Sequence, residues 1–386
     1  MLSSFSTTKI ALLPPITCRF QTKTLKQNQK YLRLLFLLLV PSLAYGQSDS
    51  LRLLFVGDVM GHAPQISSAE ISPGLYDYNH CFQFIKKEVS EADIAIANLE
   101  LTLPGKPPYS GYPMFKSPDA LAEALWNTGF DVLVTANNHS NDGRKKGVIN
   151  TIETVRKIGF AQTGTFLNKL DRDLFYPLII YKNDFKLAFL NYTYGTNGVP
   201  TDTPTIVNLI DTTLIAQDIQ EAKARKPHFI IAVMHWGLEY QLTENKDQRA
   251  LAIFLLKNGV DLVVGMHPHV VQPVRKEYIN GKHNLVAYSL GNFISNQQQP
   301  NTDVGLMLQV DLVKTAQDIK AELYNYQTIP TWRYIHKRAS QKPKFYVLPF
   351  RLLETWKSEF PEINPADLHK MKMNLEAVQK RIGQPK

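Results

Sequence analysis

The sequence predicts an α/β fold in which buried, mostly parallel strands alternate with amphipathic helices. Six short apolar runs are rich in Val, Ile, Leu and Phe, which is typical of strands buried on both faces. A cluster of polar residues follows each run. Open α/β sheets place their ligands beyond the carboxyl ends of the strands, so these clusters also predict where a functional site lies.

The predicted elements follow one another in a regular order. The apolar runs predict strands over 53–56, 92–97, 132–134, 229–234, 262–264 and 285–288. Helices are predicted over 120–127, 147–157, 214–225 and 247–258, each ending near a Gly or Pro. Downstream, 305–313, 320–326 and 344–349 alternate like half-exposed strands and predict a second sheet packed on the first, before a helical tail over 365–382. The Pro- and Gly-rich segments 104–113 and 194–204 predict ordered loops, the first of them near the polar rim.

The first 46 residues have the features of a secretory signal peptide. They contain six basic residues and no acidic one, an apolar core over 32–40, and a small-x-small ending at Ala44 and Gly46. Cleavage there predicts an exported protein, periplasmic or at the cell surface; the alternative is an uncleaved membrane anchor through residues 32–45. Removing this leader leaves 37 basic residues against 34 acidic ones, and no basic stripe interleaved with aromatic residues, which argues against a nucleic-acid partner.

Side chains suited to a metal centre occur in five of the polar clusters. Two imidazoles two residues apart, as in His267-Pro268-His269, project to the same side of an extended segment and are a moderately specific metal signal. A lone His at a strand end is more often a core residue, but neighbouring carboxylate and Asn side chains favour one or two divalent ions, such as Mn, Fe or Zn. The predicted ligands are Asp58, Glu100, Asn138, His235, His267 and His269.

Individual clusters keep alternative interpretations. Glu100 is predicted to bridge two metal ions about 4 Å apart, with Asn98 as a competing candidate. The pair of Asn residues before His139 is typical of a tight turn, but the adjoining imidazole favours a role for His139 as a general acid. Asp58 taken alone is as typical of a helix cap. Asn292, in the last cluster, fits a tight turn as well as it fits a substrate contact.

Taken in order, the motifs at 57–60, 98–100, 137–143, 235–240, 265–269 and 288–293 resemble those of the CapA-type capsule-synthesis family, which is associated with poly-γ-glutamate. The resemblance implies a divergent calcineurin-like metallophosphoesterase over 51–350, a four-layer αββα sandwich of mixed sheets with a dinuclear metal site, and a helical C-terminal tail over 351–386. Glu239 and Asn292 are the predicted substrate-binding residues. Met60 stands where the parent superfamily has its first His ligand, and 98–100 replace its bridging Asp motif.

Two functional hypotheses follow. The first is an exported metal-dependent hydrolase of phosphoester or amide bonds that acts in synthesis, export or trimming of an anionic cell-surface polymer. The second is a non-catalytic, polymer-binding component of a capsule export assembly, in which the metal orders the site. Both imply an anionic polymer and a membrane complex for capsule synthesis or export as partners. The presence of His139 favours the enzyme, and Met60 favours the binding protein.

Overall fold

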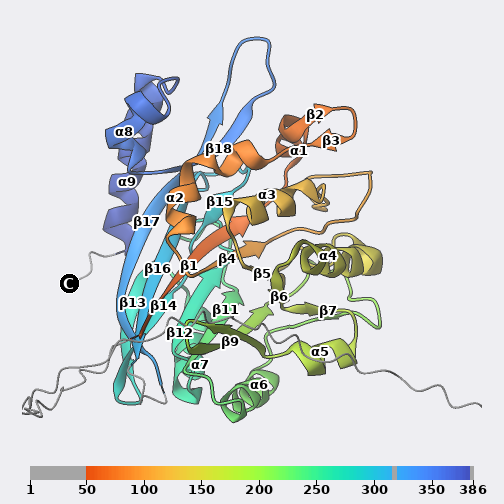
Figure 1. Ribbon diagram of the computed structural model, residues 1–386, viewed down its shortest axis with the longest axis vertical. Helices are drawn as coiled ribbons and strands as arrows, with labels where there is room; N and C mark the ends of the chain where they lie inside the picture. Colours follow the sequence, from red (N-terminus) through yellow and green to blue (C-terminus); the bar gives the residue numbers. More distant parts are fainter. Residues whose placement is uncertain (1–48, 315–319, 383–386) are drawn as a thin grey trace, which may run out of the picture. The chain divides into compact units, whose positions relative to one another are not determined.

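The computed structural model describes residues 49–314 and 320–382. These residues form four layers, in which two mixed β-sheets pack face to face and helices cover the outer face of each sheet (Figure 1). The predicted four-layer αββα sandwich is therefore confirmed. The predicted signal peptide or anchor lies outside the described residues. Within them, no helix is both long and apolar enough to cross a membrane.

Eight strands form the first sheet. In spatial order they are β18 (Lys344–Pro349), β17 (Glu322–His336), β16 (Val304–Lys314), β1 (Asp49–Val59), β4 (Ile94–Leu99), β5 (Val132–Val134) and β6 (Ala161–Thr163), with β15 (Asn292–Ile294) paired to β1. The strands β1, β4, β5 and β6 are parallel, whereas β16, β17 and β18 are antiparallel to their neighbours.

Six strands form the second sheet. In spatial order they are β13 (Val274–Ile279), β14 (Lys282–Ala287), β12 (Leu262–Met266), β11 (Phe229–His235), β9 (Phe185–Thr193) and β8 (Leu178–Lys182). The predicted division between the sheets is wrong. The late strands β16–β18 extend the sheet of β1, and the second sheet is built around β11, β12 and β14. An alternating pattern predicts which face of a strand is buried, but it does not specify the neighbouring strand.

Helices cover both outer faces. On the first sheet they are α1 (Ala63–Ala69), the 3-10 helix η1 (Asn79–Ile85), α2 (Lys86–Ser90), α3 (Ala120–Thr128) and α4 (Arg144–Ile158); on the second they are α5 (Lys169–Phe175), α6 (Thr212–Ala224) and α7 (Lys246–Asn258). The four predicted helices are confirmed as α3, α4, α6 and α7. Two small strand pairs complete this part of the chain: β2 (Glu70–Ser72) with β3 (Leu75–Tyr76), and β7 (Thr165–Phe166) with β10 (Ile206–Val207).

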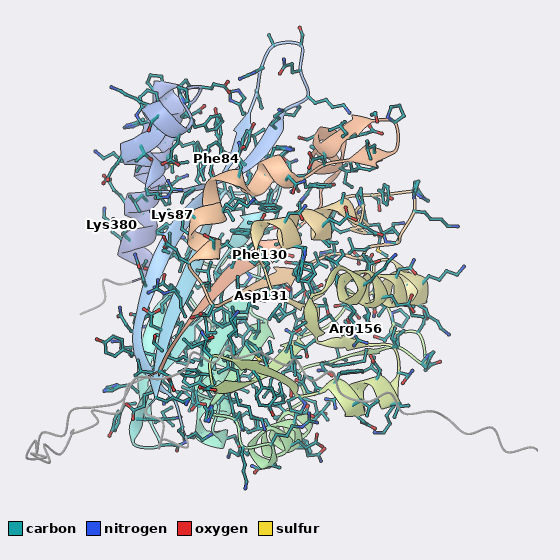
Figure 2. All side chains as sticks on the ribbon, in the orientation of Figure 1. Phe84, Lys87, Phe130, Asp131, Arg156 and Lys380 are labelled. Carbon is teal, nitrogen blue, oxygen red and sulfur yellow. The ribbon has the colours of Figure 1, made fainter. Side chains whose placement is uncertain are left out.

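The continuous apolar runs are explained by burial of both faces of each sheet. In β1, Leu53 and Phe55 point into the core between the sheets, while Leu54 and Val56 pack against the helices. Strand β11 alternates in the same way between the central core and the core under α6 and α7. Figure 2 shows Phe130, ahead of β5, in the interior, while Lys87 and Lys380 lie on the surface.

The last two helices, α8 (Leu352–Glu359) and α9 (Pro365–Ile382), lie beside β17 and β18 (Figure 1). Met371 and Val378 of α9 join the central core next to Trp332 and Tyr334 of β17. The predicted helix over 365–382 is confirmed. It covers the part of the larger sheet that carries β17, so this helix is integral to the core. The predicted domain boundaries at 46 and 350 stay predictions.

Candidate metal centre

The predicted site residues meet where the carboxyl ends of strands from both sheets come together. Asp58 and Asn98 are paired across β1 and β4 in the first sheet. His235 ends β11, and His267 follows β12, in the second sheet. These strands therefore belong to two different sheets, and their polar ends lie at one rim. The central core between the sheets brings the two edges together.

Asp58 lies inside β1, one residue before its end. The strand register shifts between Val56 and Asp58, so Gly57 forms an irregularity in the strand. A Cβ atom at position 57 would lie 1.8 Å from the carbonyl oxygen of Gly291. The Asp58 amide also donates to that oxygen, at 3.0 Å. Glycine is therefore required by close backbone approach, which places the Asp58 carboxylate at the rim.

Glu100 is the centre of the cluster. Two triads of potential ligands share it, Glu100–His267–His269 and Asp58–Glu100–His235, and within each triad the ligand atoms lie within 4.8 Å of one another. The Glu100 side chain is fully buried, and neither carboxylate oxygen has a hydrogen-bond partner among the described residues. His267 Nδ1 is buried without a partner as well. Buried carboxylates require compensation by charge or hydrogen bonds, so these residues could hold divalent metal ions, with Glu100 in both groups of ligands.

The two histidines of the His-Pro-His segment reach the cluster differently from the prediction. Both have left-handed backbones, with φ of 96° at His267 and 59° at His269, so the segment is not extended. Non-glycine residues seldom adopt this conformation, and where they do it often marks a functional site. The ring centroids lie 5.7 Å apart. His269 Nδ1 is 3.1 Å from Asp58 Oδ2, and its Nε2 is 3.9 Å from Glu100 Oε1.

Burial dominates the electrostatics of the cluster. Burial, together with the nearby Asp58 carboxylate, raises the pKa of Glu100 well above its ordinary value. Burial lowers the pKa of His235 to about 3, and burial with the neighbouring imidazoles lowers the pKa of His267 well below its ordinary value. Burial opposes ionisation of Asp58 too, but the hydrogen bond and charge of His269 bring its pKa below the usual range. Neutral imidazole is the form that binds metal.

Two asparagines hold His235. Its Nε2 lies 2.7 Å from Asn138 Oδ1 and 3.6 Å from Glu100 Oε1. Its Nδ1 lies 3.4 Å from Asn98 Nδ2, which also donates to Asp58 Oδ1 at 2.8 Å. An amide nitrogen is no metal ligand. Asn98 therefore orients Asp58 and His235 through its amide nitrogen, and the choice between Glu100 and Asn98 as the bridging group stays a prediction.

His139 lies beside the cluster and has a carboxylate behind it. Its Nδ1 is 2.7 Å from Asp142 Oδ2, and both side chains are almost completely buried. The same carboxylate oxygen accepts the amide of Phe115 at 2.5 Å. An Asp that accepts the Nδ1 proton leaves Nε2 directed away from it. This Nε2 lies 3.5 Å from the amide nitrogen of Asn197.

A pocket of about 720 Å³ opens beside these side chains and is lined by His139 and His269. Both predicted loops line it, the first through Tyr112 and Pro113 and the second through Asn197 and Val199. Glu239 also lines it, half-exposed, with Oε1 3.9 Å from His269 Nε2.

Asn292 is fully buried. Its Oδ1 lies 3.1 Å from His269 Nδ1, and its Nδ2 donates to Gln297 Oε1 and to the Thr302 carbonyl. Asn292 thus fixes His269 in place. Substrate binding by Glu239 and Asn292 stays a prediction.

Several neighbours of the cluster escaped the sequence analysis. Asp142 was not among the predicted site residues, although its spacing of three residues from His139 permits their contact. Tyr194 packs against the His267 ring, with centroids 4.6 Å apart. His62 lines the pocket, and its only sequence signal is its place four residues after Asp58. None of these residues follows an apolar run directly, and that was the pattern on which the prediction rested.

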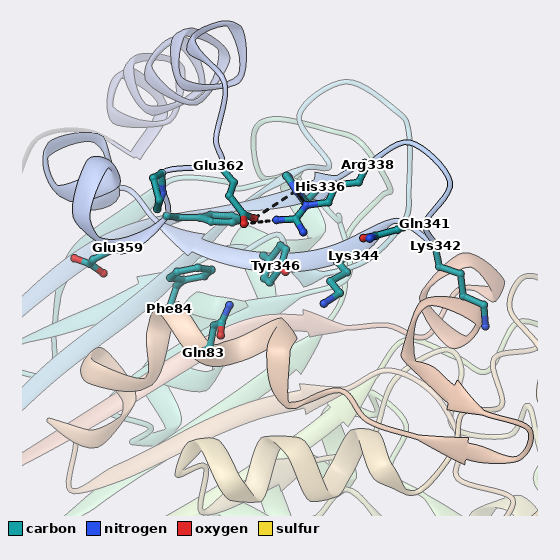
Figure 3. A pocket seen from close by; sticks show the side chains of 12 residues that line it. Gln83, Phe84, His336, Arg338, Gln341, Lys342, Lys344, Tyr346, Glu359 and Glu362 are labelled. Carbon is teal, nitrogen blue, oxygen red and sulfur yellow. Dashed lines mark hydrogen bonds and ion pairs between the residues drawn. The ribbon is translucent and has the colours of Figure 1, made fainter.

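A second pocket, of about 410 Å³, lies under the hairpin between β17 and β18 (Figure 3). Phe84 and Tyr346 contribute aromatic rings to it, and Arg338 of the hairpin forms an ion pair with Glu362. It contains none of the predicted site residues.

Comparison with known proteins identifies the family. Residues 52–297 match the model of the family described as "Bacterial capsule synthesis protein PGA_cap". The chain belongs to this family. The matched range contains every predicted ligand together with His139 and Glu239. One relative is the capsule biosynthesis protein CapA of Bacillus anthracis, which is 26% identical over 76% of this chain and 75% of that protein. Another is the PGA biosynthesis protein CapA of Bacillus subtilis, which is 26% identical over 71% of each chain.

Solved structures of similar proteins include calcineurin-like phosphoesterases. The Bacillus subtilis protein YfkN, so described, has 14% sequence identity and a TM-score of 0.45, over 86% of this chain and all of that one. The NAD nucleotidase of Haemophilus influenzae has 11% identity and a TM-score of 0.47, over 88% of this chain and 62% of that one.

Proposed function

We propose that this protein is an exported, metal-dependent hydrolase acting in synthesis, export or trimming of an anionic capsule polymer such as poly-γ-glutamate. Membership of the capsule-synthesis family supports the pathway, and both relatives carry capsule or PGA biosynthesis in their names. The observation that carries the proposed chemistry is the position of Glu100, shared by two ligand triads, with the His139–Asp142 pair nearby.

The residues divide into ligands and proton donors. Divalent ions such as Mn, Fe or Zn, one or two in number, would supply Lewis-acid chemistry, held by Asp58, Glu100, His235, His267 and His269, with Asn138 beside them. Asp142 holds the His139 imidazole by its Nδ1 atom, which leaves Nε2 directed away from the carboxylate. His139 can then keep a proton on Nε2 and give it to the leaving group as the bond breaks. Phe115 packs edge-on against the same ring, with centroids 4.6 Å apart, and limits its movement.

The proposal includes export and two partners. The leader predicted over residues 1–46 directs the chain to the periplasm or cell surface, and the mature chain begins near Gln47. The polymer is the substrate, and a membrane complex for capsule synthesis or export supplies it. N-terminal sequencing of the protein recovered without detergent tests cleavage. An intact leader on protein that only detergent extracts would favour the anchor.

The experiment for the enzyme measures metal content and hydrolysis in the same samples. Full-length protein loaded with Mn²⁺ is incubated with poly-γ-glutamate and, separately, with a generic phosphodiester. Turnover should depend on metal and should fall in His139→Ala without loss of metal. His283→Ala is the matched control, because His283 is an exposed histidine that packs on Tyr278.

The alternative is the non-catalytic binding protein. Met60, which occupies the place of a ligand in the parent superfamily and is buried in the pocket wall, favours it. Polymer binding that requires metal, without turnover of either substrate, would support this alternative and contradict the hydrolase.

A further inference from the structure

His62 lines the metal pocket but is not part of the ligand cluster. It lies directly before α1, and its ring packs edge-on against Phe115 with centroids 4.8 Å apart. The same Phe115 ring contacts His139 at 4.6 Å. Phe115 thus holds two imidazoles at the wall of one pocket.

The hydrogen bonds of His62 determine which ring nitrogen carries its proton. The backbone N–H of Asn296 points at Nδ1 from 3.1 Å. A backbone N–H can only donate, so Nδ1 must accept, and the proton of the neutral ring lies on Nε2. Gln65 Oε1 is also 3.1 Å from Nδ1, but this oxygen accepts the His62 amide at 2.9 Å. Among the described residues, no protein group bonds Nε2. Burial, with smaller effects from nearby groups, lowers the His62 pKa to about 4, so the ring stays neutral.

A buried cation lies close to this wall. Arg333 is 7% exposed and donates to the Gln297 carbonyl at 2.8 Å, one residue beyond the Asn296 amide that bonds His62. Its Nε has no hydrogen-bond partner within the described ranges, and the nearby Asp303 carboxylate forms its ion pair with Lys370. The charge of Arg333 contributes to the lowered pKa of His62, but less than burial does. Arg333 borders a neighbouring pocket together with Asp303 and does not line the metal pocket, so it adds positive charge behind this wall without contacting the ligand space.

We propose that the Nε2–H of His62 donates a hydrogen bond to an anionic oxygen of the ligand held at the metal centre. The wall that carries His62 is then an oxyanion subsite. Its ligand is a phosphoryl group or a polymer carboxylate, which offer the same acceptor chemistry. This inference rests on the proposed function and adds to it the contact that holds the anionic group.

Two substitutions separate the proposed contact from the structural role of the ring. His62→Asn keeps an acceptor near Nδ1 for the Asn296 amide and has no group at Nε2. His62→Gln places an amide N–H near Nε2 and loses the acceptor at Nδ1. Full-length protein loaded with Mn²⁺ is titrated calorimetrically with inorganic phosphate and, separately, with a γ-linked glutamate oligomer, after its metal content has been measured.

The wild type should bind at least one of the two probes. His62→Asn should weaken that binding by about tenfold or more, the effect of losing a hydrogen bond to a charged group, with unchanged metal content. His62→Gln should retain more affinity, and the affected probe shows whether the subsite takes phosphoryl or carboxylate oxygen. Unchanged affinity in His62→Asn, or no binding of either probe by the metal-loaded wild type, would overturn the proposal. If His62→Asn does not fold, loss of binding in a folded His62→Gln would overturn it.

Binding is measured here without turnover. Failure of the proposed hydrolase would appear as probe binding with no cleavage of polymer. Failure of the subsite would appear as binding that does not respond to His62. The two failures are therefore distinguishable.

Discussion

Replacing Glu100 with Gln should affect the metal-free and the metal-loaded protein in opposite directions. The substitution keeps the size of the side chain and removes its charge. In the metal-free protein, Glu100 is fully buried and its two oxygens have no hydrogen-bond partner among the described residues. In the metal-loaded protein, the same carboxylate would belong to both ligand triads. One change therefore removes a burial penalty and a bridging ligand together.

The free-energy cost of burying the Glu100 carboxyl group depends on pH. Burial and Asp58 raise the pKa of Glu100 in the folded state, so the native protein loses stability as pH rises from the ordinary Glu value toward the folded one. At pH 7 the penalty is at most about 3.7 kcal/mol, the cost of keeping a carboxyl of ordinary pKa about 4.3 protonated. A buried, unpaired amide costs about 1–3 kcal/mol instead. Metal-free Glu100→Gln should therefore be more stable than the wild type by about 1–2 kcal/mol at pH 7. At pH 5 the penalty falls to about 1 kcal/mol, so the variant should be no more stable than the wild type.

The metal-loaded comparison should reverse this order. Metal at a hundred times its Kd stabilises the wild type by about 2.7 kcal/mol. For a folded unit of this length, with an unfolding entropy of roughly 0.7 kcal/mol/K, this raises Tm by about 4 °C. Glu100→Gln should lose most of that increase, together with bound metal.

The assay is thermal unfolding at pH 5 and pH 7, with and without Mn²⁺, together with metal analysis. Glu153→Gln, which changes an exposed carboxylate on α4, is the matched control and should leave both quantities unchanged. Full metal content in Glu100→Gln would refute the bridging role. Lower metal-free stability than the wild type at both pH values would refute the electrostatic argument.

Three further predictions concern other residues. His267→Ala should lower metal content and stability, whereas His139→Ala should keep its metal and lose turnover by about 10²–10⁴-fold; equal metal loss in both would make His139 a ligand. Gly57→Ala should destabilise the fold by about 3 kcal/mol or more in chemical unfolding, because its Cβ would lie 1.8 Å from a backbone oxygen. Gly195→Ala, where nothing lies within 4 Å of the new Cβ, is its control, and equal effects of the two would contradict the close-approach argument. Because the pKa of His62 is lowered in the folded protein, this imidazole is protonated below about pH 6.5 in the unfolded chain but stays neutral in the native state. Between pH 7 and pH 5 the metal-free wild type should therefore lose about 2 kcal/mol more unfolding free energy than His62→Asn, and parallel pH profiles would contradict this.

The sequence determined the elements of this protein and the chemical composition of its site. Apolar runs such as 229–234 are buried strands because alternate side chains face two cores, and each run needs only its own residues to be recognised. The polar clusters lie at strand ends, and the structure brings Asp58, Glu100 and the histidines together. Composition alone could predict that such a set suits metal ions, because ligand preference depends on the type of donor atom.

Only the tertiary structure decided which strands pair and which side chains surround the site. The strands from 305 to 349 alternate like any half-exposed strand, and only their pairing places them next to β1 and leaves the second sheet to β11, β12 and β14. The left-handed backbone at His267 and His269 depends on contacts with Asp58, more than two hundred residues away. Glu100 has no hydrogen-bond partner among the described residues, because no donor from either sheet reaches its carboxylate. Burial can be predicted from local hydrophobicity, but pairing, backbone conformation and the neighbours of a charge arise from contacts between distant segments.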